Sequence, residues 1–93
     1  MKELDPLLHS QLRLAIMSLL VSVDEAEFTF LVQTTKAAKG NVSIQLSSLQ
    51  NAGYIVVWKA NRNGKQRTLC RITDKGLQAM ADYTEALRSY LPL

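Results

Sequence analysis

The sequence predicts an α+β fold in which several helices surround a single β-hairpin. Two observations carry this expectation. Val42, Leu46 and Leu49 recur at helical spacing within residues 39–52. Two β-branched and aromatic runs, residues 54–58 and 68–72, flank Asn63-Gly64, the strongest short-range hairpin signal. With 93 residues, the chain can build one modest core but no roomy enclosed active site beside it, so we expect a single domain over residues 1–93.

The first helix is predicted over residues 6–22. Asp5-Pro6 matches a helix start, with Asp as the N-cap and Pro as the first helical residue. Apolar side chains then follow helical spacing from Leu8 through Leu12 and Ile16 to Val23. Residues 24–27 interrupt the pattern and are interpreted as a loop with room for a short strand.

Two shorter helices follow. Thr29 is a plausible N-cap for a helix over residues 30–36, which we expect to pack through Phe30, Leu31 and Thr34. The next helix covers residues 39–52 and ends at Gly53, which can adopt the left-handed conformation typical of a C′ residue.

The hairpin and the last helix complete the chain. The residues between the two predicted strands exceed a minimal turn, so we expect a loop that projects as a flap. Thr73-Asp74 caps a final helix over residues 74–91, which stops at Pro92.

Composition excludes several classes. The apolar and charged fractions are those of an ordinary globular protein. The longest apolar stretch, residues 12–23, is too short to span a bilayer, and the charged N-terminus does not resemble a signal peptide, so we expect a cytoplasmic protein without a membrane partner. One cysteine, Cys70, and one histidine, His9, leave little for a metal site or acid–base catalysis. We expect no cofactor, no metal and no enzymatic activity.

Charge is distributed unevenly along the chain. The net charge is +3, but residues 1–35 contain two basic and five acidic side chains, while residues 59–75 contain six basic ones and a single Asp. A basic segment of this kind is typical of nucleic-acid binding, although it also occurs in solvated turns.

The order helix, short strand, helix, helix, strand, basic turn, strand, helix resembles the winged helix-turn-helix domain of small transcriptional regulators of the MarR-like and ArsR-like kind. The similarity covers nearly the whole chain. It is carried by Asp5-Pro6 with Leu12-Arg13-Leu14, Phe28-Thr29, Gly40-Asn41-Val42-Ser43 with Leu46 and Leu49, Ala52-Gly53-Tyr54-Ile55, Arg67-Thr68 and Arg71-Ile72-Thr73-Asp74-Lys75-Gly76. The resemblance implies a helix-turn-helix over residues 29–53, a wing hairpin over 54–72 and a C-terminal dimerisation helix over 73–91.

The resemblance also implies double-stranded DNA as the partner, with the helix after residue 39 in the major groove. Asn41 and Gln45 share a helix face, and either amide could pair with adenine. The polar, nearly uncharged side chains of this helix suit base edges, and the cations of the wing suit phosphates. The predicted contacts are Lys39, Asn41, Ser43, Ile44, Gln45 and Ser48 in the helix, and Arg62, Lys65 and Arg67 in the wing.

Ile44 leaves two interpretations open. An exposed β-branched side chain could contact a thymine methyl, or it could bind a protein partner. In the second case the domain would be a protein–protein interaction module, with Ile44 and Trp58 as apolar contacts.

The last helix carries two apolar stripes, one through Leu77, Thr84 and Leu91 and one through Ala79, Tyr83 and Tyr90. A small monomer needs only one of them for its core, so the other predicts a homodimer, which suits a palindromic DNA site. The predicted interface residues are Leu8, Leu12, Tyr83, Leu87, Tyr90 and Leu91. The sequence marks no pocket for a small-molecule effector.

Overall fold

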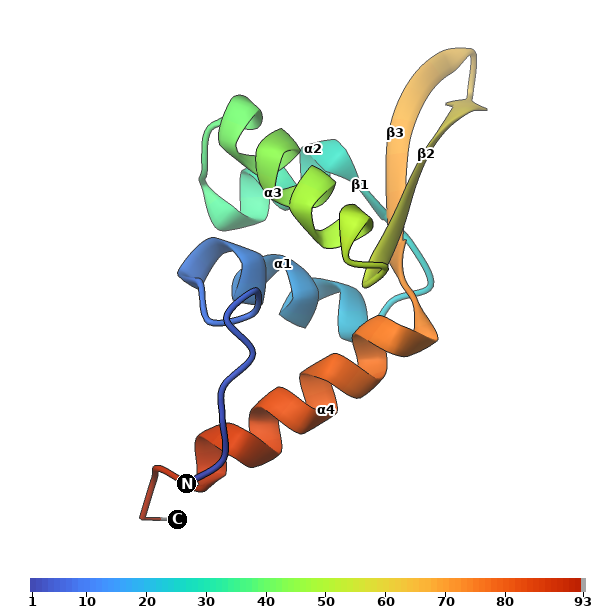
Figure 1. The fold of residues 1–93 in the computed structure, drawn as a ribbon. Helices are drawn as coiled ribbons and strands as arrows, with labels where there is room; N and C mark the ends of the chain where they lie inside the picture. The colour runs from blue at the N-terminus through green and yellow to red at the C-terminus, as the bar shows by residue number, and fades with distance from the viewer. Residues whose placement is uncertain (93) are drawn as a thin grey trace.

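A computed structural model describes residues 1–92 and confirms the α+β fold (Figure 1). Its elements are α1 (Gln11–Val21), β1 (Ala26–Glu27), α2 (Phe28–Thr35), α3 (Lys39–Asn51), β2 (Ile55–Arg62), β3 (Lys65–Ile72) and α4 (Asp74–Arg88). The strands form one antiparallel sheet in the order β1-β3-β2. No helix within residues 1–92 is long and apolar enough to cross a bilayer.

The predicted start of the first helix is wrong, because α1 begins at Gln11 rather than Pro6. Asp5 instead closes a separate turn, in which its Oδ1 accepts a hydrogen bond from the backbone N–H of Leu7 at 3.0 Å. Its Oδ2 accepts the hydroxyl of Tyr54 at 2.5 Å. The carboxylate that the sequence predicts as a helix cap is therefore bound by Tyr54, which lies 49 residues further along the chain.

The second helix also begins earlier than predicted. Glu27, the last residue of β1, occupies the N-cap position of α2, so Thr29 lies inside the helix. Leu31 is fully buried as expected, but Phe30 and Thr34 are exposed and do not pack into the core. The pairing of β1 with β3 fixes this start, because Glu27 is opposite Leu69 in the sheet.

The third helix agrees with its prediction within one residue. Val42, Leu46 and Leu49 are its buried residues, and Gly53 follows with φ +81°. Only a residue without Cβ adopts this conformation at no steric cost. The helix end is closed by a hydrogen bond from the Tyr54 N–H to the carbonyl of Leu49 at 3.0 Å.

The wing, formed by β2, the Asn63-Gly64 turn and β3, has a tighter turn than predicted. The strands remain paired as far as Arg62 and Lys65, so the loop contains only two residues. Asn63 and Gly64 both have positive φ, 55° and 80°, as a type I′ turn requires. The wing therefore projects because its strands are long (Figure 1).

The last helix starts where it was predicted to start. The Thr73 hydroxyl accepts the N–H of Gly76 at 3.0 Å and donates to the carbonyl of Gly53 at 2.6 Å. Regular helix ends at Arg88, three residues before the predicted end at 91.

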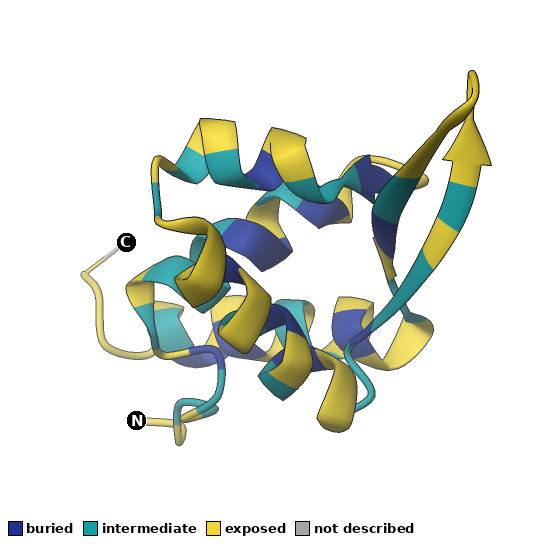
Figure 2. Ribbon diagram, turned by 90° about the horizontal axis from the view of Figure 1, so that it is seen from above, coloured by how far each residue is buried: buried dark blue, intermediate teal, exposed yellow. Residues whose placement is uncertain are grey.

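The core lies between α1, α2, α3 and the sheet, and α4 closes it from below (Figures 1 and 2). It contains mainly aliphatic side chains, with Tyr83 and Ala86 supplied by α4. Burial raises the pKa of the Cys70 thiol to about 11, so this thiol stays protonated and unreactive at neutral pH. This supports its interpretation as a small core residue.

Gly76 provides a first test of the packing of α4. A methyl group at this position would overlap the carbonyl oxygen of Tyr54 and the side chain of Ile72. We expect Gly76→Ala to lower the free energy of unfolding by about 1–3 kcal/mol, despite the better helix propensity of alanine. Gly40→Ala in α3 is the matched control, because its Cβ would meet nothing within 4 Å, and it should be neutral or stabilising by up to about 1 kcal/mol. Urea unfolding of both variants measures the difference, and equal effects would contradict the packing.

Tyr54 provides a second test through pH. Its hydrogen bond to Asp5, followed by burial and by the charges of Asp5 and Asp82, raises the Tyr54 pKa from 10.0 to about 12. The protonated phenol is the form that the fold favours, so its stabilisation is complete below about pH 10 and is lost as the pH rises toward 12. The difference in unfolding free energy between the wild type and Tyr54→Phe should therefore vanish over that interval. The difference between the phenol absorbance titrations of the wild type and Tyr54→Phe gives the midpoint at which Tyr54 loses its proton. A midpoint near the ordinary value of 10.0 would contradict this account.

Candidate nucleic-acid interface

The outward face of α3 is polar, with one apolar exception. The predicted contacts Lys39, Asn41, Ser43 and Ile44 are exposed, while Gln45 and Ser48 are half-buried. Ile44 is 64% exposed, and its position two residues after Val42 places it on the side of the helix opposite to the core. The exposed surface of α3 is therefore built from small polar side chains around Ile44.

One flank of α3 is tied to α1 by a chain of side-chain hydrogen bonds. Arg13 donates through Nη1 to Oε1 of Gln45 at 2.6 Å. Gln45 in turn donates through Nε2 to Oδ1 of Asn41 at 2.9 Å. Both amides that the sequence predicts as base contacts are thus connected to each other, and the spacing along α3 could not reveal the bond from Arg13.

The other flank of α3 forms a groove with the wing. This groove has a volume of about 320 Å³ and includes Ser43 and Ser47 of α3 opposite Val57, Lys59 and Thr68 of the wing. Gln50 helps to fix its width, because its Oε1 accepts the backbone N–H of Val57 at 2.6 Å. The groove thus combines three hydroxyls with one exposed cation.

Lys59 is not among the predicted contacts, although the alternation of side chains along the strand indicates which way it points. Side chains alternate between the faces of a strand, so Lys59 points to the same side as Val57, toward α3. Its cross-strand neighbour is Thr68, which lines the same groove. The signal was the two-residue spacing between Lys59 and Val57, a strand residue that faces α3.

The three predicted wing cations share the opposite face of the hairpin. In the hairpin register, Arg62 is opposite Lys65 and Arg67 is opposite Ala60. Because side chains alternate along a strand, all three cations lie on the face opposite to the one that contains Lys59. Arg62 also forms an ion pair with Glu25 at 3.1 Å, which ties the wing to the loop before β1. Of the three, Arg62 is therefore already engaged in the free protein.

Ile44 and Trp58 do not form a single apolar surface. Trp58 follows Val57 in β2, so its side chain points to the strand face away from the α3 groove. It is half-buried opposite Leu69 of β3. The two residues that would carry a protein-binding module thus lie on different sides of the wing.

The predicted dimer residues separate into two groups. Leu8 and Tyr83 are buried within the chain at 0% and 5% exposure, so neither offers surface to a partner. Leu12 and Leu87 are half-buried, and Tyr90 and Leu91 are exposed. Ala79 and Tyr83 of α4 face the core. Of the other predicted stripe, Met80 and Leu87 also pack against the core, Leu77 and Thr84 are exposed, and Leu91 lies beyond the end of the helix.

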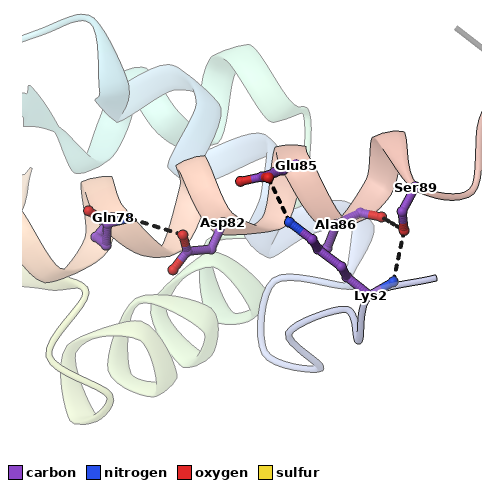
Figure 3. Close-up of polar contacts among 6 residues, drawn as sticks. All are labelled: Lys2, Gln78, Asp82, Glu85, Ala86 and Ser89. Carbon is purple, nitrogen blue, oxygen red and sulfur yellow. Dashed lines mark hydrogen bonds and ion pairs between the residues drawn. The ribbon is translucent and has the colours of Figure 1, made fainter.

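The N-terminal segment lies along the C-terminal half of α4 (Figure 3). Lys2 donates through its backbone N–H to the Ser89 hydroxyl at 2.9 Å and through Nζ to Glu85 at 2.6 Å. The hydrogen bond from Lys2 lowers the pKa of the Glu85 carboxyl. His9 contacts the Tyr83 hydroxyl at 2.9 Å, so the same segment also reaches the buried face of the helix.

A second depression lies between this segment and α4. It has a volume of about 690 Å³, and its charged lining consists of Glu3, Asp5 and Asp82 with Lys75. Its net negative charge is unsuited to phosphate, so a DNA backbone would avoid this end of the molecule. Among residues 1–92, no group of three or more His, Cys, Asp and Glu side chains could hold a metal ion. The expectations of no metal and no catalysis stay predictions.

Comparisons with known proteins agree with this architecture. A family model described as a winged helix DNA-binding domain matches residues 12–91. The uncharacterized protein MJ0432 of Methanocaldococcus jannaschii is 29% identical over 75 residues, which cover 81% of this chain and 82% of that protein.

Solved structures show the same fold. The transcriptional regulator homologue protein from Pyrococcus horikoshii OT3 has a TM-score of 0.85 at 24% identity, covering 90% of this chain and 83% of that one. Bacillus subtilis PadR, solved in complex with operator DNA, has a TM-score of 0.71 at 21% identity, covering 81% of this chain and 47% of that one.

The resemblance to small winged-helix regulators is confirmed, whereas the finer MarR-like and ArsR-like assignment is loose, because PadR proteins are among the structural neighbours. The family match extends from the first turn of α1 through the wing and α4. The chain belongs to the winged helix DNA-binding domain family.

Proposed function

We propose that this protein is a transcriptional regulator that binds a palindromic DNA site as a homodimer. In this proposal α3 enters the major groove, the wing follows the phosphate backbone, and α4 forms the dimer. The observation that carries it is the polar face of α3 beside a groove that contains Lys59. Figure 1 supports this assignment of DNA binding and dimerisation to different elements, because α3 and the wing lie at one end of the molecule and α4 at the other.

The α3 face is suited to close approach to DNA. Ser43, Ser47 and Ser48 are short, so the helix axis could come near the base edges. Ile44 stands at the centre of that face, where a methyl-bearing thymine edge is its natural apolar partner. Lys39 opens the helix at its N-terminus, the end that enters the major groove in helix-turn-helix proteins.

The groove beside α3 is suited to a phosphate backbone. Lys59 supplies charge, and the Ser43 and Ser47 hydroxyls supply hydrogen-bond donors at its rim. Lys65 and Arg67 add positive charge near the tip of the wing, on the strand face opposite to Lys59. The PadR neighbour was solved on operator DNA, which supports DNA as the partner of this arrangement. A protein with this role would act in the cytoplasm, where it meets the DNA.

The outward stripe of α4 is our proposed dimer surface. It contains the exposed Leu77 and Thr84, with Leu87 half-buried at its edge, and the exposed Tyr90 and Leu91 follow the end of the helix. An apolar stripe of this kind pairs well with its own copy around a two-fold axis. A palindromic site requires such a dimer to place the two α3 helices about one DNA turn apart, roughly 34 Å.

Lys59 gives the sharpest test of DNA binding. We expect Lys59→Ala to weaken binding to a random-sequence duplex and to reduce the slope of log K against log salt by about 0.9 for each chain bound, because one phosphate contact is lost. Lys75→Ala is the matched control, since Lys75 lies over the Tyr54 ring at the acidic end of the molecule. Fluorescence anisotropy from 20 to 200 mM salt measures both. No binding by the wild type at the lowest salt would overturn the regulator function.

Paired substitutions on α4 and α3 test the dimer and its rival together. We expect Leu77→Arg to convert a dimer into a monomer, because it places two like charges at the two-fold contact. Ile44→Arg, which replaces another exposed apolar side chain, should leave the dimer intact. Light scattering reports the molar mass of each. Dissociation by Ile44→Arg instead would identify α3 as a protein interface and favour the interaction module.

A further inference from the structure

We infer that Arg13 of α1 determines which base edge Asn41 reads, by holding the amide oxygen of Asn41 toward Gln45 and leaving its NH₂ group to face DNA. The inference rests on the proposed docking of α3 in the major groove and names a specificity device within it. The observation behind it is the chain of hydrogen bonds from Arg13 through Gln45 to Asn41.

Arg13 is held rigidly enough to act as the fixed end of this chain. It is half-buried, and its Nε donates to the carbonyl oxygen of Leu7 at 2.6 Å while Nη1 donates to Gln45. The guanidinium is planar, so these two bonds in different directions fix its orientation. Its charge strengthens the bond to the Gln45 oxygen relative to a bond between neutral groups.

The chemistry of arginine then fixes both amides. A guanidinium contains no acceptor, so the Gln45 atom that faces it must be the oxygen. The Gln45 amide nitrogen consequently points toward Asn41, 2.9 Å from an atom that must itself be an acceptor, Oδ1. The Asn41 side chain is exposed, and its NH₂ group is the part of the amide that remains for DNA.

This arrangement argues against the adenine contact expected from the sequence. In a bidentate pair with adenine, one amide donates through its NH₂ group to N7 and accepts through its oxygen from the N6 amino group at the same time. In Gln45 both amide atoms are already engaged. Turning both atoms of Asn41 toward an adenine would swing its oxygen away from Gln45 or make that oxygen accept two hydrogen bonds at once. An Asn41 that presents its NH₂ group instead matches guanine, with acceptors at O6 and N7, or the O4 acceptor of thymine.

Arg13 is therefore a positioning residue, and its test is a base-preference profile rather than affinity alone. Selection from a randomised duplex library, followed by sequencing, should show guanine or thymine at one base pair of each half-site for the wild type. Asn41→Ala should remove that preference, about tenfold in relative enrichment, without changing neighbouring positions. Arg13→Met should relax the preference at the same base pair or shift it toward adenine. The double variant should match Asn41→Ala.

Two further variants make the result decisive. Gln45→Leu breaks the chain without touching the bond from Arg13 to Leu7, so it should give the same altered profile even where Arg13→Met is too unstable to purify. Arg71→Met removes an equal charge from an exposed site on the strand face away from α3 and should keep the wild-type profile.

Selection of adenine by the wild type at the position that Asn41→Ala affects would overturn the inference. Unchanged profiles for Arg13→Met and Gln45→Leu would overturn it as well. In both cases DNA would still be bound, so the proposed function would stand. A wild type that enriches no sequence and binds no duplex at low salt would overturn the proposed function together with the inference.

Discussion

The two residues Gly53-Tyr54 form the junction on which the rest of the structure depends. Their backbone receives or supplies the hydrogen bonds that end α3, begin α4 and anchor the wing. Tyr54 N–H bonds to Leu49 of α3, its carbonyl accepts the N–H of Thr73, and the Gly53 carbonyl accepts the Thr73 hydroxyl. The carbonyl of Tyr54 also lies against Gly76, where only a glycine leaves room. One short turn thus fixes the orientation of three elements.

The rigidity of this junction has a functional consequence. Because α3 and β2 leave it in fixed directions, the groove between α3 and the wing has a defined width, which the bond from Gln50 to Val57 reinforces. Because α4 leaves it on the other side, the proposed dimer surface is held at the opposite end from the DNA-facing surface (Figure 1). The Asp5 bond to Tyr54 then ties the N-terminal segment to the same turn.

The sequence predicted features that arise from neighbours along the chain. The buried stripe of α3, the left-handed Gly53, the Asn63-Gly64 turn and the Thr73 cap are all local, and all are confirmed. The errors came from contacts between distant residues. Asp5 closes a separate turn before α1, with its carboxylate also bound by Tyr54, and α2 starts early because β1 pairs with β3. In the candidate site, Gln45 is engaged by Arg13 from another helix, which no spacing along α3 could reveal.

The proposed DNA-facing surface combines little charge with many small polar groups. A net charge of +3 gives weak general attraction to phosphates, so discrimination must come from the α3 face more than from electrostatics. The measurement that tests this account most directly is an amide chemical-shift titration of the ¹⁵N-labelled protein with a short duplex at low salt. The account predicts that shifts concentrate in residues 39–51 and 59–68. Shifts confined to residues 74–91, or the absence of any shift, would contradict it.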